Sequence, residues 1–328
     1  MQAWVVHEYG DYKDVLRWEA FPAPQVRPDH GVIRVTGAGI SFAMMLKIAG
    51  KYQVRDPLPF VPGLEVAGVV TEAGEGFPYA VGQRVMGLTY TGCCCEYAAL
   101  QTVNTFPVPD EMSDAHAAAF LNAYQTAYLG LVDRARVQPG ETVLVNSGAG
   151  GVGLAAVQIA SALGARVLAT AGSAEKLAVC REHGAEDAFD YTAGPFVEAV
   201  QAATGGRGVD VVIDPVGGEA FDQGLRCLAW NGRMVVIGFT SGQIPQVRVN
   251  RLLLGNIATL GLLRTTYPDH APVLIRQCQE HLVHLYRQGR VRPVVSHALP
   301  MAELPRAIGL VESRRAHGKV IVTLPAGG

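Results

Sequence analysis

The stretch NSGAGGVGLAAVQIA restricts the possible folds of this chain more than any other part of it. It contains the pattern G-x-G-x-x-G, formed by Gly148, Gly150 and Gly153, between the apolar segment TVLV and a segment of helical character. Glycines at this spacing allow a tight turn and bring a pyrophosphate onto the N–H groups of a helix N-terminus, where Gly151 and Val152 lie. An ordinary glycine-rich turn is the alternative, but the position between strand and helix favours dinucleotide binding.

The segments around this motif alternate in the way that a doubly wound α/β domain requires. Apolar strands such as TVLVNS and VDVVID are separated by helical segments such as GVGLAAVQIASAL and EAFDQGLRCLAW. Strands that are apolar throughout suit a parallel sheet with helices on both faces. We therefore expect a Rossmann-type dinucleotide-binding domain over residues 122–265.

The remainder of the chain has a different pattern of apolar and turn residues. Before about residue 110, short alternating runs such as GVIRVTGAGI and EVAGVVTEAG are separated by turn residues, which is typical of an all-β domain. After residue 265 come one amphipathic segment, PVLIRQCQEHLVHLYRQG, and strands that end in KVIVTLP. A chain of 328 residues is long enough for two domains. We expect residues 1–121 and 266–328 to form the second domain together.

The end of the second strand of the dinucleotide domain indicates which nucleotide is bound. An NAD site needs an acidic side chain about 20 residues after the motif, whereas the strand ARVLATA runs here into Gly172 and Ser173. Ser173 and Lys176 offer a hydroxyl and an ammonium to a 2′-phosphate, although Glu175 weakens the positive field. The sequence therefore favours NADPH over NADH. The alternative is that Ser173 only caps the next helix and Lys176 is a solvated surface charge.

Composition excludes several classes of partner. The net charge is only −2, so nothing favours a nucleic-acid groove or an anionic membrane surface. No window reaches the roughly 18 apolar residues of a membrane span. The six cysteines lack the regular spacing of a secreted disulfide framework. We expect a cytoplasmic protein that acts on small molecules, without a nucleic-acid or membrane partner.

Seven motifs follow one another along the chain: PFVPGLEVAGVV, VGQRVMGL, NAYQTAYLGL, PGETVLVNSGAGGVGLAAVQIA, ATAGSAEKL, GRGVDVVIDPVGGEAF and NGRMVVIGFTSGQIP. Together they resemble the medium-chain dehydrogenase/reductase superfamily, and specifically its zinc-free quinone oxidoreductase branch, the zeta-crystallin-like enzymes. The resemblance covers nearly the whole chain. It implies a GroES-like β-barrel catalytic domain and a Rossmann domain inserted into it, with cofactor and substrate meeting in the cleft between them.

The resemblance also implies further cofactor contacts. Tyr191 is similar to the residue that stacks near the adenine, and Arg314 to a second partner of the 2′-phosphate. Gly238 and Phe239 resemble the main-chain contacts of the nicotinamide. Asn250 resembles part of a second loop on the nicotinamide side.

The sequence predicts that no metal is bound. Zinc-dependent relatives hold a catalytic zinc through a Cys and through the His of a Pro-Gly-His-Glu motif, whereas Ser41 and Leu64 stand here. The run TGCCCEYAAL contains Cys93, Cys94 and Cys95, but adjacent residues on a strand point to opposite faces, so the run alone makes a poor tetrahedral site. By the resemblance these cysteines line the substrate end of the cleft. A cysteine that faces the cleft could react with an electrophilic substrate.

Hydride transfer without a metal suits an acceptor whose conjugation spreads the developing charge, such as a quinone or an α,β-unsaturated ketone or aldehyde. The candidate catalytic donors, at positions that the family places near the nicotinamide, are Tyr52, Ser41 and Thr126. Tyr52 is preferred because a phenol can donate while it is neutral. Met44 and Met45, together with the cysteines, suggest an apolar slot for a bulky acceptor.

Two further expectations concern activity and assembly. The branch commonly has Asn at position 41 and Asp three residues later, where this chain has Ser41 and Met44. This difference leaves open an alternative function, an NADPH-binding, crystallin-like protein with little catalysis. The segment ATLGLL is expected at the exposed edge of the nucleotide sheet, which indicates a homodimer.

Overall fold

The computed structural model describes residues 1–325, which divide into two compact units. One unit comprises Met1–Asn122 and the chain from Pro293 onward, and the other comprises Ala123–Arg292. The expected class, a mainly β domain together with a Rossmann-type parallel sheet, is confirmed. Within the described chain, no helix combines the length and the apolar character that crossing a bilayer requires.

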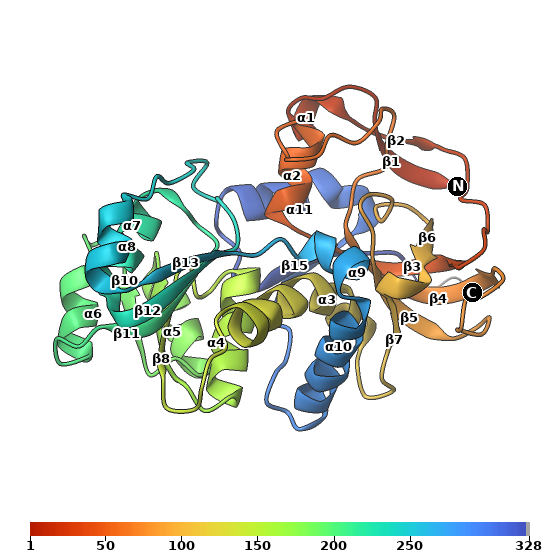
Figure 1. Ribbon diagram of the computed structural model, residues 1–328. Coiled ribbons are helices and arrows are strands. Elements are labelled where there is room, and N and C mark those ends of the chain that lie inside the picture. The colour runs from red at the N-terminus through yellow and green to blue at the C-terminus, as the bar shows by residue number, and fades with distance from the viewer. Residues whose placement is uncertain (326–328) are drawn as a thin grey trace. The chain divides into compact units, whose positions relative to one another are not determined.

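The second unit is a six-stranded parallel sheet with helices packed on it (Figure 1). Its strands are β8 (Thr142–Val145), β9 (Arg166–Ala171), β10 (Asp187–Asp190), β11 (Val209–Asp214), β12 (Leu228–Val236) and β13 (Ala258–Gly261). Its helices are α4 (Gly151–Ala162), α5 (Ala174–Glu182), α6 (Val197–Ala203), α7 (Gly218–Cys227), α8 (Val249–Gly255), α9 (Tyr267–His270) and α10 (Pro272–Arg287). The spatial order β10-β9-β8-β11-β12-β13 reverses direction between β8 and β11. In such sheets the ligand crevice lies at this reversal, outside the carboxyl ends of the strands.

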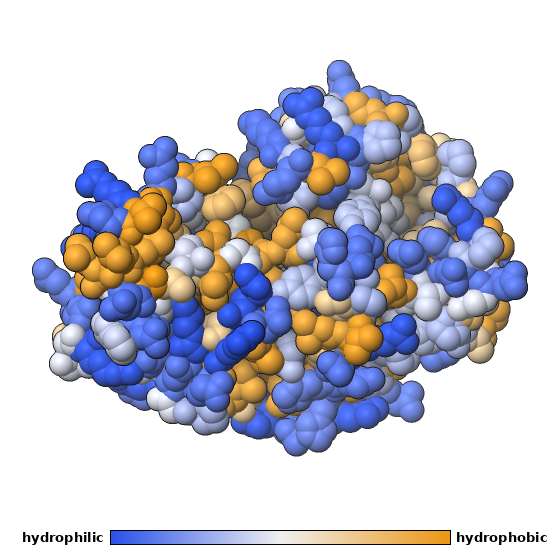
Figure 2. All heavy atoms as spheres, viewed as in Figure 1, coloured by the Kyte–Doolittle hydropathy of each residue, from blue (hydrophilic) through white to orange (hydrophobic). Residues whose placement is uncertain are grey.

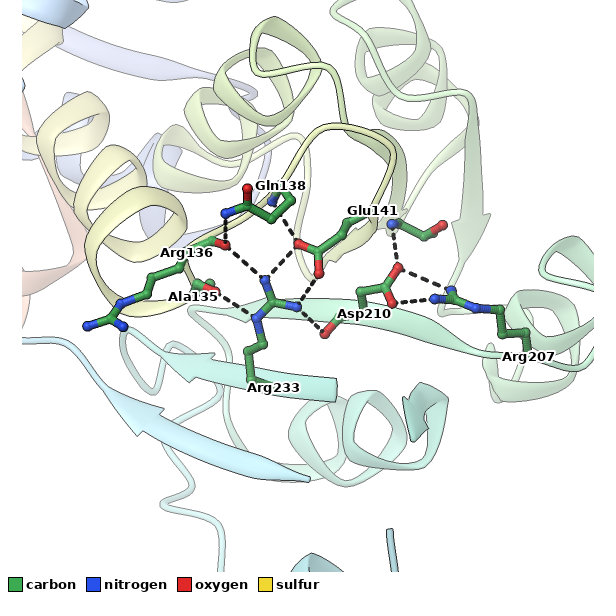
Figure 3. Close-up of polar contacts among 8 residues, drawn as sticks. Ala135, Arg136, Gln138, Glu141, Arg207, Asp210 and Arg233 are labelled. Carbon is green, nitrogen blue, oxygen red and sulfur yellow. Dashed lines mark hydrogen bonds and ion pairs between the residues drawn. The ribbon is translucent and has the colours of Figure 1, made fainter. Parts of the chain in front are cut away.

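The amino ends of these strands are joined by an ion-pair network (Figure 3). Arg233 on β12 donates to both carboxylate oxygens of Glu141 at 2.7 Å and to the carbonyl oxygen of Ala135 at 2.7 Å. The carboxylate of Asp210 on β11 accepts from Arg207 at 2.5 Å, and the carbonyl oxygen of Asp210 accepts from Arg233 at 3.4 Å. Because the network lies at the end of the sheet opposite the expected crevice, it stabilises the strand arrangement and takes no part in binding there.

The first unit is built on a seven-stranded sheet and a separate two-stranded ribbon, β1-β2. Its strands are β1 (Gln2–Val6), β2 (Leu16–Ala20), β3 (His30–Ile40), β4 (Glu65–Ala73), β5 (Arg84–Leu88), β6 (Tyr97–Gln101), β7 (Thr105–Pro107), β14 (Val295–Pro300) and β15 (Lys319–Thr323). Its helices are α1 (Tyr12–Val15), α2 (Phe42–Ile48) and α11 (Leu304–Glu312). The order is β14-β15-β3-β4-β5-β7, with β6 paired to β3. Since β15 pairs with β3, a strand near the C-terminus belongs to the same sheet as strands from the first hundred residues.

The chain returns to the first unit later than the expected boundary at residue 266. Residues 266–292 group with the parallel sheet, because α10 packs on α3 (Asp114–Tyr128), the helix in which the first crossing between the units falls. Gln125 on α3 donates to Gln279 on α10 at 3.1 Å, and the Tyr128 hydroxyl lies 2.8 Å from His281 Nδ1. The amphipathic pattern of α10 predicts a buried face, but it does not identify the surface that this face covers.

A buried carboxylate joins three segments of the first unit. Glu65, on β4, is 1 % exposed; one of its oxygens accepts from Lys319 Nζ on β15 at 2.8 Å. The other accepts from the main-chain N–H of Asn122 on α3 at 2.9 Å. Gly39 on β3 leaves the necessary space, because a Cβ there would lie 2.5 Å from the Glu65 carboxylate. Removing one partner of a buried ion pair costs about 3–5 kcal/mol, so this contact strongly favours the observed pairing of β15.

The three adjacent cysteines lie in the hydrophobic core of the first unit. Cys93 and Cys94 are 0 % exposed and Cys95 is 1 % exposed. The Cys94 sulfur lies 3.9 Å from that of Met44, and the Cys95 thiol donates to the Tyr97 carbonyl at 3.1 Å. Burial raises the pKa of all three thiols, that of Cys93 to about 12. Their thiolates, the reactive form, are therefore strongly disfavoured.

The expectation that these cysteines line a cleft is therefore wrong, and the reaction with substrate, which was expected only of an accessible thiol, has no exposed cysteine to carry it. In the expected apolar slot, Met44 is buried like the cysteines, at 0 % exposed, whereas Met45 is half-buried. The reason is that the N-terminal strand covers the cysteine run: Trp4 donates its main-chain N–H to the Cys94 carbonyl at 3.0 Å, and Ala3 bridges to Cys95. A pairing between segments some 90 residues apart has no local signal in the sequence.

Candidate functional site

The glycine-rich loop connects β8 to α4 at the carboxyl end of the parallel sheet. A Cβ on Gly148 would lie 2.7 Å from the Ala169 Cβ, and one on Gly153 would lie 2.1 Å from the Ser147 carbonyl oxygen. These two glycines are therefore required by the close packing of loop, strand and helix. Gly150 is the N-cap of α4 and no side chain caps the helix.

The first turn of α4 is suited to a bound anion. The N–H groups of Gly151, Val152 and Gly153 lie in this turn, where an α-helix has no partners of its own for them. Without a capping side chain these donors and the positive end of the helix dipole are left for a ligand. The loop thus fits the pyrophosphate of a dinucleotide.

A polar pair that sequence reasoning missed lies where the strand order reverses. Asn146, after β8, donates to the Asp214 carboxylate at the end of β11 at 3.0 Å. Asp214 also accepts from the main-chain N–H groups of Val216 and Gly217 at 3.1 and 3.0 Å. Burial raises the pKa of Asp214, and Asn146 Oδ1 is buried without a partner in the described part of the chain. The only signal was a polar residue at the end of each apolar strand, in VLVN and VVID.

The structure brings together four of the residues predicted to contact the nucleotide, at the ends of β9 and β10 and in the first turn of α5. A Cβ on Gly172 would lie 2.5 Å from the Tyr191 hydroxyl, so the Tyr191 ring lies directly against Gly172. Ser173 is the N-cap of α5, and its hydroxyl oxygen accepts from the Lys176 N–H at 3.3 Å. This hydroxyl can still donate its own proton to a phosphate. No carboxylate lies at the end of β9 itself; Asp190, which ends β10, pairs with Ala171, and Glu175 is exposed on the first turn of α5.

The predicted nicotinamide contacts are only partly assembled. Phe239, in the loop after β12, packs on the loop after β11: a Cβ on Gly217 would lie 2.9 Å from the Phe239 ring. Gly238 precedes it in the same loop. Asn250 lies on the exposed first turn of α8, and no hydrogen bond within residues 1–325 links it to these strand-end loops. Arg314 belongs to the first unit, directly after α11, with a left-handed φ of +54°.

The candidate donors of the first unit are linked by α2. Ser41 is the N-cap of this helix, and its hydroxyl oxygen accepts from the Met44 N–H at 3.4 Å. Tyr52 follows the helix, and its ring centroid lies 5.2 Å from the ammonium of Lys47. Lys47 in turn pairs with Asp56 at 2.7 Å. Thr126, on α3 in the second unit, is 7 % exposed.

Tyr52 is held in its neutral form. Burial raises the pKa of its phenol, and the carboxylate of Asp56 and the neighbouring phenol of Tyr90 raise it further. Lys47 and Asp56 were not identified from the sequence, although a lysine within the apolar run FAMMLKI was a visible signal.

The positions of the zinc ligands of zinc-dependent relatives carry side chains that do not bind zinc. They are Ser41, whose hydroxyl caps α2, and Leu64, which is packed in the core. Within residues 1–325 no group of three or more His, Cys, Asp or Glu side chains is placed to hold a metal ion.

Comparisons with known proteins agree with this arrangement. A family model described as "Alcohol dehydrogenase GroES-like domain" matches residues 27–110, and one described as "Zinc-binding dehydrogenase" matches residues 151–280. Quinone oxidoreductase-like protein 2 of Bos taurus is 39 % identical over 93 % of this chain and 88 % of its own. Its homolog in Nematostella vectensis is 37 % identical over 94 % of this chain and 84 % of its own.

Solved structures show the same similarity. The quinone oxidoreductase of Thermus thermophilus is 36 % identical, with a TM-score of 0.85 over 99 % of this chain and 100 % of its own. The quinone oxidoreductase of Escherichia coli is 27 % identical, with a TM-score of 0.92 over 99 % of this chain and 100 % of its own. The chain therefore belongs to the medium-chain dehydrogenase/reductase superfamily of oxidoreductases, in its zinc-free quinone oxidoreductase branch.

Proposed function

We propose that this protein is an NADPH-dependent oxidoreductase that transfers a hydride to a quinone or an α,β-unsaturated carbonyl compound without a metal ion. The observation that carries the proposal is a complete nucleotide loop in a chain that has Ser41 and Leu64 at the positions of the zinc ligands. The similar quinone oxidoreductases of T. thermophilus and E. coli have structures in complex with NADPH.

The proposed nucleotide contacts lie along the carboxyl end of the parallel sheet. The N–H groups at the start of α4 bind the pyrophosphate, and Ser173 and Lys176 bind the 2′-phosphate, for which the family resemblance also proposes Arg314. The absence of an acidic side chain at the end of β9 supports this preference, because a carboxylate there would repel the phosphate. The other proposed contacts are Tyr191 at the adenine and Gly238, Phe239 and Asn250 at the nicotinamide.

The chemistry requires a donor for the acceptor oxygen. Bound NADPH supplies a hydride to an electron-poor carbon of the acceptor. Tyr52 donates a hydrogen bond to the oxygen on which negative charge develops; a phenol is protonated at neutral pH, and burial, which raises the pKa of Tyr52, favours the protonated form further. Ser41 and Thr126 are the further candidate donors. Conjugated acceptors suit this weak assistance because they spread the charge themselves.

A second candidate function is NADPH binding with little catalysis, as in crystallin-like relatives. It is favoured by Met44, which occupies the position of the usual carboxylate and packs its side chain against Cys94 at 3.9 Å. No carboxylate is therefore available there for a proton relay.

The proposal places the protein in the cytoplasm. All six cysteines are free thiols, which a reducing compartment maintains.

The first prediction concerns the cofactor. Lys176→Gln should raise the dissociation constant of NADPH about tenfold, because it removes one charge-assisted hydrogen bond to the 2′-phosphate. The dissociation constant of NADH, which lacks this phosphate, should not change. Fluorescence titration of the wild type, Lys176→Gln and Lys176→Arg with both nucleotides measures this. Equal affinity of the wild type for NADPH and NADH would contradict the assignment.

The second prediction concerns the reaction. Purified protein should oxidise NADPH in the presence of a quinone or of an alkenal, at a rate that a zinc chelator does not change. Substrate panels with each acceptor class, run with and without the chelator, test this. Tight NADPH binding without turnover on any acceptor would instead support the crystallin-like function, and chelator-sensitive turnover of a simple alcohol would contradict both.

We further propose a homodimer that forms around β13. This strand pairs only with β12 among the strands of residues 1–325, so its other edge can add a strand from a second copy. The adjoining helix α8 exposes Val249, Leu253 and Leu254, each more than 70 % exposed. An apolar area lies in the region of α8, at the left of Figure 2. An exposed apolar patch beside a free strand edge supports self-association.

The third prediction follows from this surface. The wild type should have twice the 34.8 kDa chain mass in light scattering, whereas Leu253→Glu/Leu254→Glu should be monomeric. Val273→Glu, at an apolar residue on α10 that is 66 % exposed, is the matched control and should remain dimeric. A monomeric wild type would refute the dimer, and a dimeric double variant would refute this interface.

A further inference from the structure

We infer that the buried ion pair between Lys47 and Asp56 positions Tyr52 for catalysis. The inference rests on the proposed role of Tyr52 as the hydrogen-bond donor to the acceptor oxygen. It assigns to Lys47 and Asp56 a positioning role, exerted through Tyr52.

The pair is closed off from solvent. Lys47 lies in the last turn of α2, and its side chain is 3 % exposed; that of Asp56 is 10 % exposed. The ammonium donates to Asp56 Oδ2 at 2.7 Å. Both charges are therefore desolvated and depend on each other.

Tyr52 lies in the loop that this pair closes. Residues 51–56 contain no helix or strand, so backbone hydrogen bonds of regular structure do not fix the loop. The Lys47 ammonium lies 5.2 Å from the Tyr52 ring centroid, within the range of a cation–π contact. The carboxylate of Asp56 holds this ammonium from the other end of the loop. The orientation of the Tyr52 ring thus depends on where the pair places the ammonium.

The other anchors hold the backbone near the two ends of the loop, and Arg55 Nε also donates to the Gly50 carbonyl at 3.2 Å. The Lys51 N–H donates to the Leu46 carbonyl at 2.8 Å, next to the helix. At the far end the Tyr9 hydroxyl donates to the Asp56 carbonyl. None of these contacts involves the Tyr52 side chain, whose neighbours include the Tyr90 phenol and the Lys47 ammonium, and Lys47 is the one of these two that belongs to α2.

Burying a lysine at this position costs free energy. This cost is explained if the ion pair that the lysine forms selects one conformation of the loop. The neighbours of this lysine on α2, Met44 and Ile48, are both 0 % exposed, so an apolar side chain would fit the same surroundings. Apolar residues of similar size often replace a buried ion pair without loss of stability, and the best-attested benefit of such a pair is that it selects one arrangement. Here the selected arrangement is that of the Tyr52 loop on α2, the helix whose N-cap is Ser41.

The test separates positioning from stability. Lys47→Met/Asp56→Leu replaces both partners and leaves no unpaired buried charge. The matched control is Lys13→Met/Glu312→Gln, which removes an exposed pair whose ammonium lies 5.1 Å from the ring centroid of another tyrosine, Tyr12. Each double variant is also made in the Tyr52→Phe background, and Asp56→Asn is a milder variant in case the first does not fold.

Two readouts are measured on the full-length protein. Amide hydrogen exchange over residues 51–56 should become about tenfold faster in Lys47→Met/Asp56→Leu, and faster also in Asp56→Asn, while β3 and β4 keep their protection. The kcat with NADPH and an accepted quinone should fall by the same factor as in Tyr52→Phe, with an unchanged KM for NADPH. The triple variant should be no slower than Tyr52→Phe alone, because the pair acts through the phenol. The control pair should change neither readout.

Unchanged exchange in both Lys47→Met/Asp56→Leu and Asp56→Asn would overturn the inference, as would a triple variant in which the losses multiply. If the wild type itself does not turn over, the proposed function fails, and with it the catalytic half of this inference. The exchange measurement then still decides whether the pair holds the Tyr52 loop.

Discussion

The buried contact of Glu65 with Lys319 and Asn122 is the constraint on which the rest of the first unit depends. One carboxylate links β4, the C-terminal strand β15 and helix α3, which are separated by up to 254 residues along the chain. Burying a carboxylate that is 1 % exposed costs free energy unless its oxygens are paired, so the three segments stabilise one another. A strand from the end of the chain thereby completes a sheet begun by its first hundred residues.

This connectivity leaves the middle of the chain to form a unit of its own. There the parallel sheet determines where chemistry can occur, because the loops at the carboxyl ends of its strands converge where the order reverses. Gly148, Gly153, Gly172 and Gly217 lie in or beside these loops, and at each of them a Cβ would be closer than 3.0 Å to a neighbouring atom. The Asp214 carboxylate holds the loop after β11 in place by accepting hydrogen bonds from two main-chain N–H groups of that loop.

The features that the sequence predicts are those with a local physical signature. The glycine pattern before α4, the missing acid after β9 and the uniformly apolar strands can each be recognised from a few neighbouring residues. Together they predict the fold class. The burial of the cysteines could not be predicted from the sequence. The residues that cover them, Ala3 and Trp4, belong to the N-terminal strand, far from the cysteines along the chain. The Lys47–Asp56 pair could not be predicted, because it depends on the path of an irregular loop. The placement of α10 could not be predicted either, because the sequence does not say which surface its apolar face covers.

The central claim is that hydride passes from NADPH to a conjugated carbonyl compound with the help of side chains alone. It is tested most directly by following deuterium from NADPH that carries deuterium at both C4 positions into an accepted enone, with protein that elemental analysis shows to be free of zinc. The account predicts one deuterium on the β-carbon of each product molecule for each NADPH consumed. NADPH consumption without deuterium in the product, or transfer that appears only when zinc is restored, would contradict it.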